Sequence, residues 1–484
     1  MPLSQNAIYL LNQRYCKNGE SPENVFKRTA EFIGKGDTKF EEKLFTAMIN
    51  GVFLPNSPAL FNSGFKKAQL HACFTLPLED DTSAIFETVA NMARIFKCVS
   101  ANQELFTSSG LKKASNIVIG DFLFDSFGEI NKVVDVIPSG IKTIFKVTTD
   151  SGYTIYCSDN HKLKILQNID SRGRCNKQTK SLYEELKNIK LGDLINISYP
   201  IYDGEEIPIT FTQELTSTKN DGKFKIKEIT LPKYLTTDLA WFLGMFVGDG
   251  NYHYDEIRFT VGKRDIELIE KLKTIGTSLG LEFKTTLRDN AYIIGVWSKN
   301  LKNFISNFIG ENKYNIPTIL FKAKTEIRAS FLKGLFDSDG TVSKYGAISY
   351  CSSDRELAKK IQDLLLSLGI FSKIRYRENG FKGHNTVLIK TTDSQTKFID
   401  LINSNCKFKQ QRFIIYDSKR RYDYVLFDSN RFDKVVSIEK LGEDYTYNFT
   451  MEDIHEYNST GIVSKNSGGG VGINFSKLRE KDAV

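Results

Sequence analysis

An abrupt change of sequence character at two distant points constrains this chain most. Residues 98–466 are rich in Lys, Tyr and Asn and contain strand-like runs, and a glycine cluster of a different character follows at residues 468–470. Removing residues 98–466 leaves a segment that reads as one continuous domain. We therefore predict that residues 98–466 are an insert, and that residues 1–97 and 467–484 are the two arms of the interrupted domain.

Composition favours a cytoplasmic protein of several domains. The length of 484 residues suggests about two to four domains. The seven cysteines show no CxxC spacing and the N-terminus no signal-peptide pattern, which predicts a reducing cytoplasm. The apolar run 239–247 is too short to cross a bilayer, so we expect no membrane partner. The net charge of +8 fits a polyanionic partner and a plain basic surface equally well.

The insert contains strand-like sequence at both of its ends. β-branched and aromatic residues dominate these runs, and Gly, Asp, Asn and Ser separate them. They lie at residues 118–123, 132–137, 143–148, 153–157, 190–195, 433–438 and 445–450. This pattern predicts an all-β unit that residues of about 200 to 428 interrupt.

The interrupting segment contains an internal repeat. Residues 243–250 resemble residues 333–340, and residues 268–280 resemble residues 357–369 at nearly the same offset. Two separate matches at one offset predict a two-lobed α/β domain with pseudo-twofold symmetry.

Each copy of the repeat places an aspartate at the end of an apolar helix. Asp249 and Asp339 precede Gly250 and Gly340, which are typical helix stops. A carboxylate at a helix C-terminus opposes the helix dipole at a cost of roughly 0.3–1 kcal/mol. A divalent cation such as Mg²⁺ between the two helix ends would offset both charges. The alternative is two turn carboxylates that face water.

The residues at the two junctions have the chemistry for breaking and making peptide bonds. The Cys98 thiol can attack the preceding carbonyl, and an acid such as His161 must then protonate the leaving nitrogen. Asn466 can cleave the chain after itself by cyclisation, with His455 nearby, and Ser467 supplies a hydroxyl nucleophile. A single His is more often structural, so the prediction depends on the combination.

These motifs resemble those of an intein, a self-splicing insert with an all-β Hint fold. Ser158-x-x-His161 matches the family's Thr-x-x-His motif, and residues 447–466 match its C-terminal motif. The resemblance implies that Ser158 orients the first junction, that Ser467 accepts the N-terminal arm and that Asn466 releases the insert. The chain departs from the family at Lys465, where His is usual, and at Asn448, where Asp is usual.

The repeat resembles the paired motifs of LAGLIDADG homing endonucleases, which are often nested in inteins. The resemblance implies paired helices between two lobes, Asp249 and Asp339 as Mg²⁺ ligands, Lys313 as an active-site lysine and double-stranded DNA as the partner. The DNA target implied is the host gene without the insert. Basic residues at 373–378 and 263–264 fit DNA contacts or, equally, a solvated strand face.

The two arms resemble the large subunit of ribonucleotide reductase, most closely the adenosylcobalamin-dependent class. Matching pieces are residues 12–15, 55–64, 72–80 and the joined seam. The resemblance implies an oxidoreductase with a ribonucleotide substrate, Ser57 at that substrate and Cys73 in a redox pair. The adenosylcobalamin site is expected outside this chain. Cys73 alone would read as a small buried hydrophobe.

We predict a multidomain chain with a helical reductase arm, an all-β Hint domain and an α/β endonuclease. The predicted alternatives are a β domain that cleaves without ligating, a DNA-binding module without nuclease activity, and an ordinary reductase subunit with an inert insertion. The predicted parts are residues 1–97 (reductase), 98–200 (Hint), 201–428 (endonuclease), 429–466 (Hint) and 467–484 (reductase).

Overall fold

The chain divides into two compact units in a computed structural model. One unit comprises residues 1–95 and 468–484, and the other comprises residues 96–467. The structure describes residues 3–16, 19–65, 70, 74–77, 98–170, 174–219, 222–379, 382–415, 424–452, 454–465 and 471–474.

Four helices make up most of the described part of the first unit. They are α1 (Gln5–Arg14), α2 (Pro22–Gly34), α3 (Thr38–Ile49) and α4 (Ser57–Asn62). The start of α2 agrees with the sequence, because the Ser21 side chain caps the helix and Pro22 occupies its first turn. Their apolar faces form a small core of Leu11, Val25, Phe26, Ala30, Met48 and Leu60.

The two arms of the first unit pair with each other across the insert. Strand β1 (Phe74–Pro77) pairs in parallel with β25 (Val471–Asn474), with Phe74 opposite Val471. These strands lie on opposite sides of residues 98–466 in the sequence, so the arms contribute to one folded unit.

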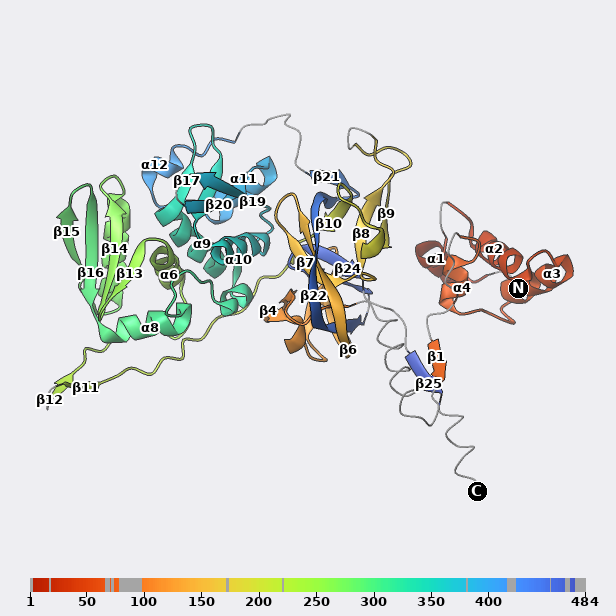
Figure 1. Ribbon diagram of the computed structural model, residues 1–484, viewed down its shortest axis with the longest axis horizontal. Helices are drawn as coiled ribbons and strands as arrows, with labels where there is room; N and C mark the ends of the chain where they lie inside the picture. The colour runs from red at the N-terminus through yellow and green to blue at the C-terminus, as the bar shows by residue number, and fades with distance from the viewer. Residues whose placement is uncertain are drawn as a thin grey trace, which may run out of the picture. The chain divides into compact units, whose positions relative to one another are not determined.

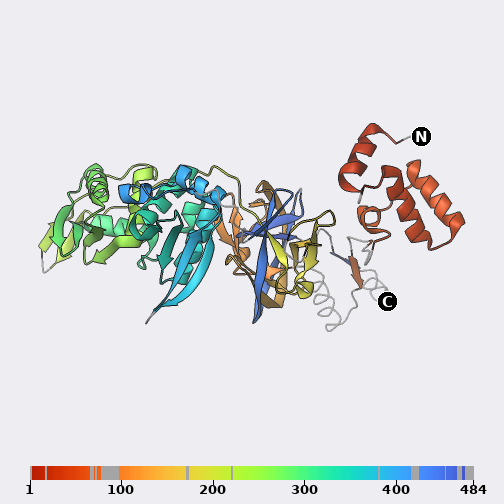
Figure 2. The same ribbon diagram turned by 90° about the horizontal axis from the view of Figure 1, so that it is seen from above.

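The second unit contains a sheet of thirteen strands among its described residues. Two long strands dominate it, β6 (Ile130–Thr149) and β22 (Asn430–Met451), which pair antiparallel over nearly their whole length and lie side by side in Figure 1 and Figure 2. Each was predicted as two separate strands. β-Bulges keep each strand continuous through the Gly and Asp positions that suggested breaks.

The remaining strands of this sheet are short and come from both ends of the insert. They are β2 (Val99–Ser100), β3 (Glu104–Thr107), β4 (Gly110–Lys113), β5 (Phe122–Phe124), β7 (Thr154–Ser158), β8 (Lys162–Gln167), β9 (Lys180–Glu185), β10 (Leu194–Ile197), β21 (Tyr424–Phe427), β23 (Glu456–Ser459) and β24 (Ile462–Lys465). Strand β21 precedes the predicted boundary at residue 429 and pairs with β22.

Residues between the two halves of this sheet form two lobes of the same topology. Each lobe has a four-stranded sheet in which the fourth strand in the sequence lies between the second and the third. The strand orders are β13-β14-β16-β15 and β17-β18-β20-β19. The first lobe contains α6 (Thr237–Asp249), β13 (Gly250–His253), β14 (Glu256–Gly262), α7 (Ile266–Ser278), β15 (Lys284–Arg288), β16 (Ala291–Trp297) and α8 (Lys299–Ile309). The second contains α9 (Thr325–Asp339), β17 (Gly340–Val342), β18 (Ile348–Ser352), α10 (Arg355–Leu366), β19 (Lys373–Asn379), β20 (Lys382–Ile389), α11 (Thr392–Leu401) and α12 (Lys407–Gln410). A hairpin, β11 (Thr216–Lys219) and β12 (Gly222–Lys225), precedes them.

Helices α6 and α9 pack tightly against each other between the two lobe sheets (Figure 1). Glycine permits this approach: a Cβ at Gly244 would lie 2.0 Å from the Phe331 carbonyl oxygen, and one at Gly334 would lie 2.1 Å from that of Trp241. Residues 239–248 of α6 are all buried, as the all-round apolar sequence predicted.

Gly250 and Gly340 end these helices for a reason other than the predicted one. Their φ angles are −77° and −74°, so neither adopts the left-handed conformation of a typical glycine cap. A Cβ at Gly250 would instead lie 2.3 Å from the Phe246 ring, and one at Gly340 would lie 2.1 Å from the Phe336 ring. Both positions need glycine because an aromatic ring occupies the space.

The large sheet and the two lobes share one continuous hydrophobic core. Buried Arg328 of α9 reinforces the connection, because its guanidinium donates to the backbone oxygens of Tyr202 and Ser367 at 3.0 and 2.6 Å. The guanidinium also lies 4.0 Å from the Tyr202 ring centroid. Among the described residues no helix has the length and apolar character needed to cross a membrane.

Candidate functional sites

Cys98 is held by the turn that follows β7. Its side chain is fully buried, and its backbone carbonyl accepts a hydrogen bond from the Ser158 backbone N–H at 3.0 Å. The Ser158 hydroxyl accepts from the Cys98 backbone N–H at 3.3 Å and donates to Asn160 Oδ1 at 2.7 Å. Ser158 therefore contacts the nitrogen that the predicted first step would release.

His161 lies in the same turn and is also fully buried. Its backbone N–H donates to the Ser158 carbonyl at 3.0 Å, which places both predicted residues in one tight turn. The His161 ring packs near the Tyr457 ring, with 6.4 Å between centroids. Burial raises the pKa of the Tyr457 hydroxyl well above its ordinary value, and the nearby Cys98 and Cys157 add to the shift.

The strand that leads to the second predicted junction lies beside this turn. Strand β24 pairs with β8, with Lys465 opposite Lys162, the residue that follows His161. Lys465 thus lies on the strand next to the one that begins directly after His161, although about 300 residues separate the two in sequence. Asn466 and Ser467 themselves lie outside the described residues.

Both basic residues near the second junction have a lowered pKa. Burial lowers the pKa of Lys465, and the positive charge of Lys162 lowers it further. The pKa of His455 is lowered mainly by desolvation and then by the charge of Lys465, although the His455 side chain still reaches solvent. The charge of Lys465, at the position where the family usually has His, thus acts on His455.

Asn448 lies beside Cys98 in the sheet. Val99 pairs with Tyr447 and Ser100 with Thr446, so the register continues with Cys98 opposite Asn448. Asn448 is fully buried, and within the described part of the chain neither atom of its amide has a hydrogen-bond partner. A buried, unsatisfied amide at this point is costly and suits a group that a reacting chain would contact.

Asp249 and Asp339 meet at the C-terminal ends of α6 and α9. Burial and the neighbouring Asp339 raise the pKa of Asp249 to about 7. Tyr350 donates to Asp339 Oδ2 at 3.4 Å, and burial raises the Tyr350 pKa well above its ordinary value. Asp249 is partly buried and Asp339 is exposed, and the charge of Asp339 disfavours the charged form of Asp249.

Lys313, the predicted active-site lysine, reaches the end of α6. Its ammonium donates to the carbonyl oxygens of Gly248 and Gly250 at 2.5 and 2.8 Å. Burial lowers the pKa of Lys313, and the charges of Asp339 and Asp249 oppose that shift.

Lys409 is the counterpart of Lys313 in the second lobe, and the sequence analysis missed it. Its ammonium donates to the carbonyl oxygens of Phe336 and Asp337 at the end of α9, each at 2.7 Å. The charge of Lys409 also acts on Asp249 in the direction that lowers its pKa. The two lysines occupy dissimilar sequence contexts, so the repeat gave no signal for Lys409.

The aspartate pair suits a hard divalent cation. Mg²⁺ takes oxygen ligands and commonly completes its shell with water and substrate phosphates. Within the described ranges, no group of three or more His, Cys, Asp or Glu residues could hold a metal ion. Asp249 and Asp339 would therefore share such an ion with non-protein oxygens.

The basic segment 373–378 forms strand β19, but Lys373 does not extend toward a free surface. Its ammonium pairs with Asp150 of the large sheet at 2.5 Å. Lys263 and Arg264 are exposed. Their exposure is compatible both with a surface that contacts DNA and with a solvated turn.

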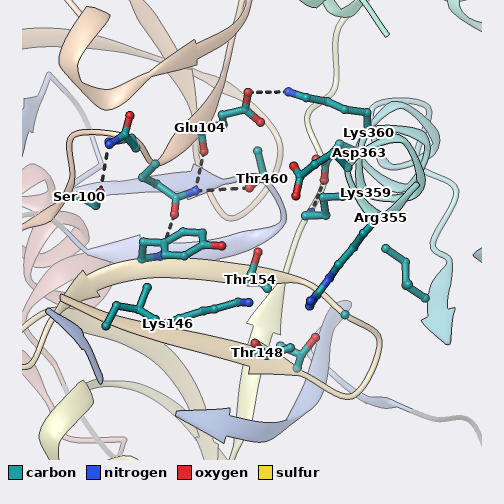
Figure 3. Close-up of a pocket in the computed structure, with 18 of the residues that line it drawn as sticks. Ser100, Glu104, Lys146, Thr148, Thr154, Arg355, Lys359, Lys360, Asp363 and Thr460 are labelled. Carbon is teal, nitrogen blue, oxygen red and sulfur yellow. Dashed lines mark hydrogen bonds and ion pairs between the residues drawn. The ribbon is translucent and has the colours of Figure 1, made fainter. Parts of the chain in front are cut away.

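A groove of about 1160 Å³ lies between the large sheet and the second lobe. One of its walls is closed by an ion pair of 2.5 Å between Lys360 of α10 and Glu104 of β3 (Figure 3). Lys146 and Arg355 point into the groove from opposite sides in Figure 3. The groove has nearly balanced charges, so it does not by itself indicate an anionic ligand.

The reductase residues are placed only in part. The Ser57 hydroxyl lies at the start of α4, 3.0 Å from the Tyr15 hydroxyl. Cys73 lies outside the described residues.

Comparison with protein families identifies two segments of the chain. Residues 1–68 match the ribonucleotide reductase all-alpha domain, and residues 326–403 match the LAGLIDADG-like domain. The chain thus contains one segment similar to a ribonucleotide reductase domain and another similar to a LAGLIDADG-like domain. The predicted resemblances to ribonucleotide reductase and to LAGLIDADG proteins are confirmed at this level. The multidomain fold with a helical arm, a sheet-rich region and an endonuclease-like region is also confirmed.

Curated relatives include a ribonucleoside-diphosphate reductase NrdEB subunit alpha from Bacillus subtilis, 24% identical over 433 residues, which cover 76% of this chain and 36% of the relative. A glutamine–fructose-6-phosphate aminotransferase from Methanocaldococcus jannaschii is 27% identical over 257 residues, or 49% of this chain and 23% of the relative. The chain spans about a third of the length of the reductase relative.

Solved structures with partial similarity include the homing endonuclease I-DmoI in complex with DNA and Mn, at 18% identity and a TM-score of 0.29 over 35% of this chain and 97% of that one. The gp41-1 intein is 22% identical with a TM-score of 0.17 over 21% of this chain and 68% of that one.

Proposed function

We propose that residues 98–466 excise themselves by protein splicing and join the two flanking arms. The observation that carries this proposal is the meeting of β24 with the turn that holds Cys98. Lys465, which precedes the second junction, pairs with Lys162 beside His161. A fixed fold that pairs β24 with β8 would make reactions between the two junctions intramolecular, which raises the effective concentration of the reacting groups by orders of magnitude.

At the first junction, the Cys98 sulfur attacks the carbonyl carbon of residue 97. The C–S bond forms, the C–N bond breaks and the departing nitrogen receives a proton from His161. The hydrogen bond between Ser158 and that nitrogen supports a role in orienting it. Burial of His161 beside this turn supports the role of acid, because a desolvated imidazolium transfers its proton readily.

At the second junction, the Ser467 hydroxyl takes over the N-terminal arm as an ester. The Asn466 side-chain nitrogen then attacks its own backbone carbonyl and releases the insert, with His455 supporting this step. A final oxygen-to-nitrogen shift restores the peptide bond. The partly buried Lys465 next to Asn466, with its lowered pKa, supports a proton-transfer role where the family has His.

The relatives support an insert that is shared among unrelated hosts. A match to the reductase covers 76% of this chain, and one to the aminotransferase covers 49%, although the two named activities have nothing in common. A match that covers 76% of the chain must include much of residues 98–466, because the two arms are short. The matching part is thus independent of what the host does.

The direct test is a peptide that crosses the joined seam. Digestion after Glu would release residues 88–97 joined to residues 467–480 as one peptide, whose mass and fragments identify the new bond. We expect this peptide in the expressed chain and not in a Cys98→Ala variant. Its absence from the unmodified chain would refute ligation.

We propose as a second function that residues 201–428 cleave double-stranded DNA at the host gene without the insert. The repelling Asp249 and Asp339 carboxylates support this function, because a shared Mg²⁺ would relieve their repulsion. Bound Mg²⁺ would supply Lewis-acid activation and charge neutralisation at a DNA phosphate. Lys313 and Lys409, at the two helix ends, would place positive charge beside the scissile phosphates.

The test is cleavage of a DNA duplex that encodes the uninterrupted seam, residues 88–97 followed by 467–480. Asp249→Asn and Asp339→Asn variants should bind this duplex and fail to cut it. Equal cutting by these variants would refute the assignment.

We also propose that the two arms belong to an adenosylcobalamin-dependent ribonucleotide reductase. The β1–β25 pairing supports one host domain built from both arms. In that domain, Ser57 would contact the ribonucleotide and Cys73 would take part in its reduction. Restored reductase activity of the spliced full-length host, measured with and without adenosylcobalamin, tests this proposal.

A further inference from the structure

A lysine from the middle of β6 reaches the nucleophile of the proposed splicing reaction. The Lys142 ammonium lies 3.4 Å from the Cys98 sulfur. Lys142 is partly buried and Cys98 fully buried, so little water separates the two groups. No motif in the sequence pointed to Lys142, which lies 44 residues after Cys98.

The other groups around Cys98 do not offer a comparable charge. Asn448, the residue after the Tyr447 that pairs with Val99, is a neutral amide. Tyr457 of β23 and Cys157 of β7 stay protonated near neutral pH because burial raises the pKa of each. His161 belongs to the turn on the nitrogen side of the bond.

Two carboxylates of β22 also lie along this edge. Asp444 lies opposite Lys142, and Glu443 lies opposite Thr143. Asp444 accepts hydrogen bonds from the Ser100 hydroxyl and from the Tyr445 backbone N–H, which hold its side chain in place. Asp444 thus faces Lys142 across the two strands.

We propose that the Lys142 ammonium stabilises the Cys98 thiolate that starts splicing. The inference rests on the proposed splicing function and assigns one further catalytic residue to it. Nearby cations favour the thiolate form of cysteine, and the thiolate is the nucleophile. In this chain the Lys142 ammonium, 3.4 Å from the Cys98 sulfur, would supply that fixed positive charge.

The Cys98 thiol loses its proton to solvent, and Lys142 keeps its own proton throughout. The thiolate forms a C–S bond with the carbonyl carbon of residue 97, the C–N bond breaks, and His161 delivers one proton to the nitrogen. Lys142 acts only by charge, so Arg can replace it and an uncharged side chain cannot.

The test isolates the first step in a chain carrying Asn466→Ala and Ser467→Ala, which blocks the later ones. Dithiothreitol releases the N-terminal arm from a thioester at Cys98, and the release rate is measured from pH 6 to pH 9. The variants are Lys142→Met, Lys142→Gln and Lys142→Arg. Lys146→Met is the matched control, because Lys146 is on the same strand and points into the groove (Figure 3).

We expect Lys142→Met and Lys142→Gln to slow release about tenfold at pH 7 and to move the rising limb of the pH profile about one unit upward, as loss of a nearby cation predicts. Lys142→Arg should keep the profile of the parent, and so should Lys146→Met. A purely structural role would lower the rate without moving the profile.

Different results refute different claims. An unchanged profile in the folded Met and Gln variants, or a Lys142→Arg profile shifted as far as theirs, would overturn the role of Lys142 alone. A parent that releases no arm at any pH would overturn the splicing function, and the role of Lys142 with it. Far-ultraviolet circular dichroism establishes which variants are folded.

Discussion

Asp249→Asn should stabilise the metal-free protein at alkaline pH. The pKa of Asp249 rises from 3.8 to about 7 in the folded chain, mainly through burial and then through Asp339. Because the pKa of Asp249 is higher in the folded than in the unfolded chain, protonated Asp249 favours folding. This contribution to the free energy of unfolding is complete below the unfolded-state pKa of Asp249 and is lost as the pH rises through about 7. Asparagine has nearly the same shape and carries no charge, so the Asp249→Asn variant should not lose stability in this way as the pH rises.

The size of the effect follows from the shift. One pKa unit corresponds to about 1.4 kcal/mol, so the full shift would be worth on the order of 4 kcal/mol. Because Asp249 retains some solvent exposure, screening reduces the expected gain at pH 8 to roughly 2–4 kcal/mol.

The assay is urea unfolding in EDTA at pH 5 and pH 8, with a chain that carries Cys98→Ala and Asn466→Ala. Tryptophan fluorescence reports on the first lobe, because the chain has two Trp residues, Trp241 in α6 and Trp297 in β16. We expect the parent to lose stability between pH 5 and pH 8 and Asp249→Asn to lose much less.

The matched control is Asp238→Asn, an aspartate on the same helix whose side chain is 65% exposed. It should show the pH dependence of the parent. If Asp249→Asn also shows that dependence, the carboxylates do not repel each other as the structure implies, and the reasoning that places a cation between them fails.

Three further substitutions test the packing and the second lysine. Gly334→Ala should destabilise the chain by at least about 1–3 kcal/mol in the same urea assay, because its Cβ would meet the Trp241 carbonyl at 2.1 Å; unchanged stability would contradict the tight α6–α9 packing. Lys409→Met should lower DNA cleavage about tenfold while gel-shift affinity changes little, as expected for a charge beside the scissile phosphate; equal losses of both would indicate a binding role. Arg328→Met should cost about 3–5 kcal/mol, because it leaves buried carbonyls such as that of Ser367 without a donor, and a cost below about 1 kcal/mol would contradict that role.

The repeat allowed most of the endonuclease-like region to be predicted. Apolar residues all round α6 and matching offsets in two segments predicted a buried helix and a two-lobed domain with Asp249 and Asp339 at the helix ends. The family resemblance added that the helices pair, and the structure brings the two residues together. Such patterns can be recognised in the sequence because each one is set by residues within a single helix.

Contacts between distant elements could not be predicted in this way. Lys142 reaches Cys98, and Lys409 reaches the end of α9, through strand register and lobe packing that leave no local pattern. The continuity of β6 and β22 was missed for the same reason, because cross-strand pairing carries each strand through its Gly and Asp positions. The helix ends at Gly250 and Gly340 likewise depend on aromatic rings one turn back, and not on glycine's conformational freedom.

The intact mass of the expressed chain tests the central claim most directly, with a Cys98→Ala, Asn466→Ala chain as the control. In the unmodified sample we expect two products in place of the full-length chain, the joined arms and the free insert of residues 98–466. In the control we expect only the full-length chain. Full-length chain alone in both samples would contradict self-splicing. Release of the N-terminal arm without the joined product would contradict ligation through Ser467.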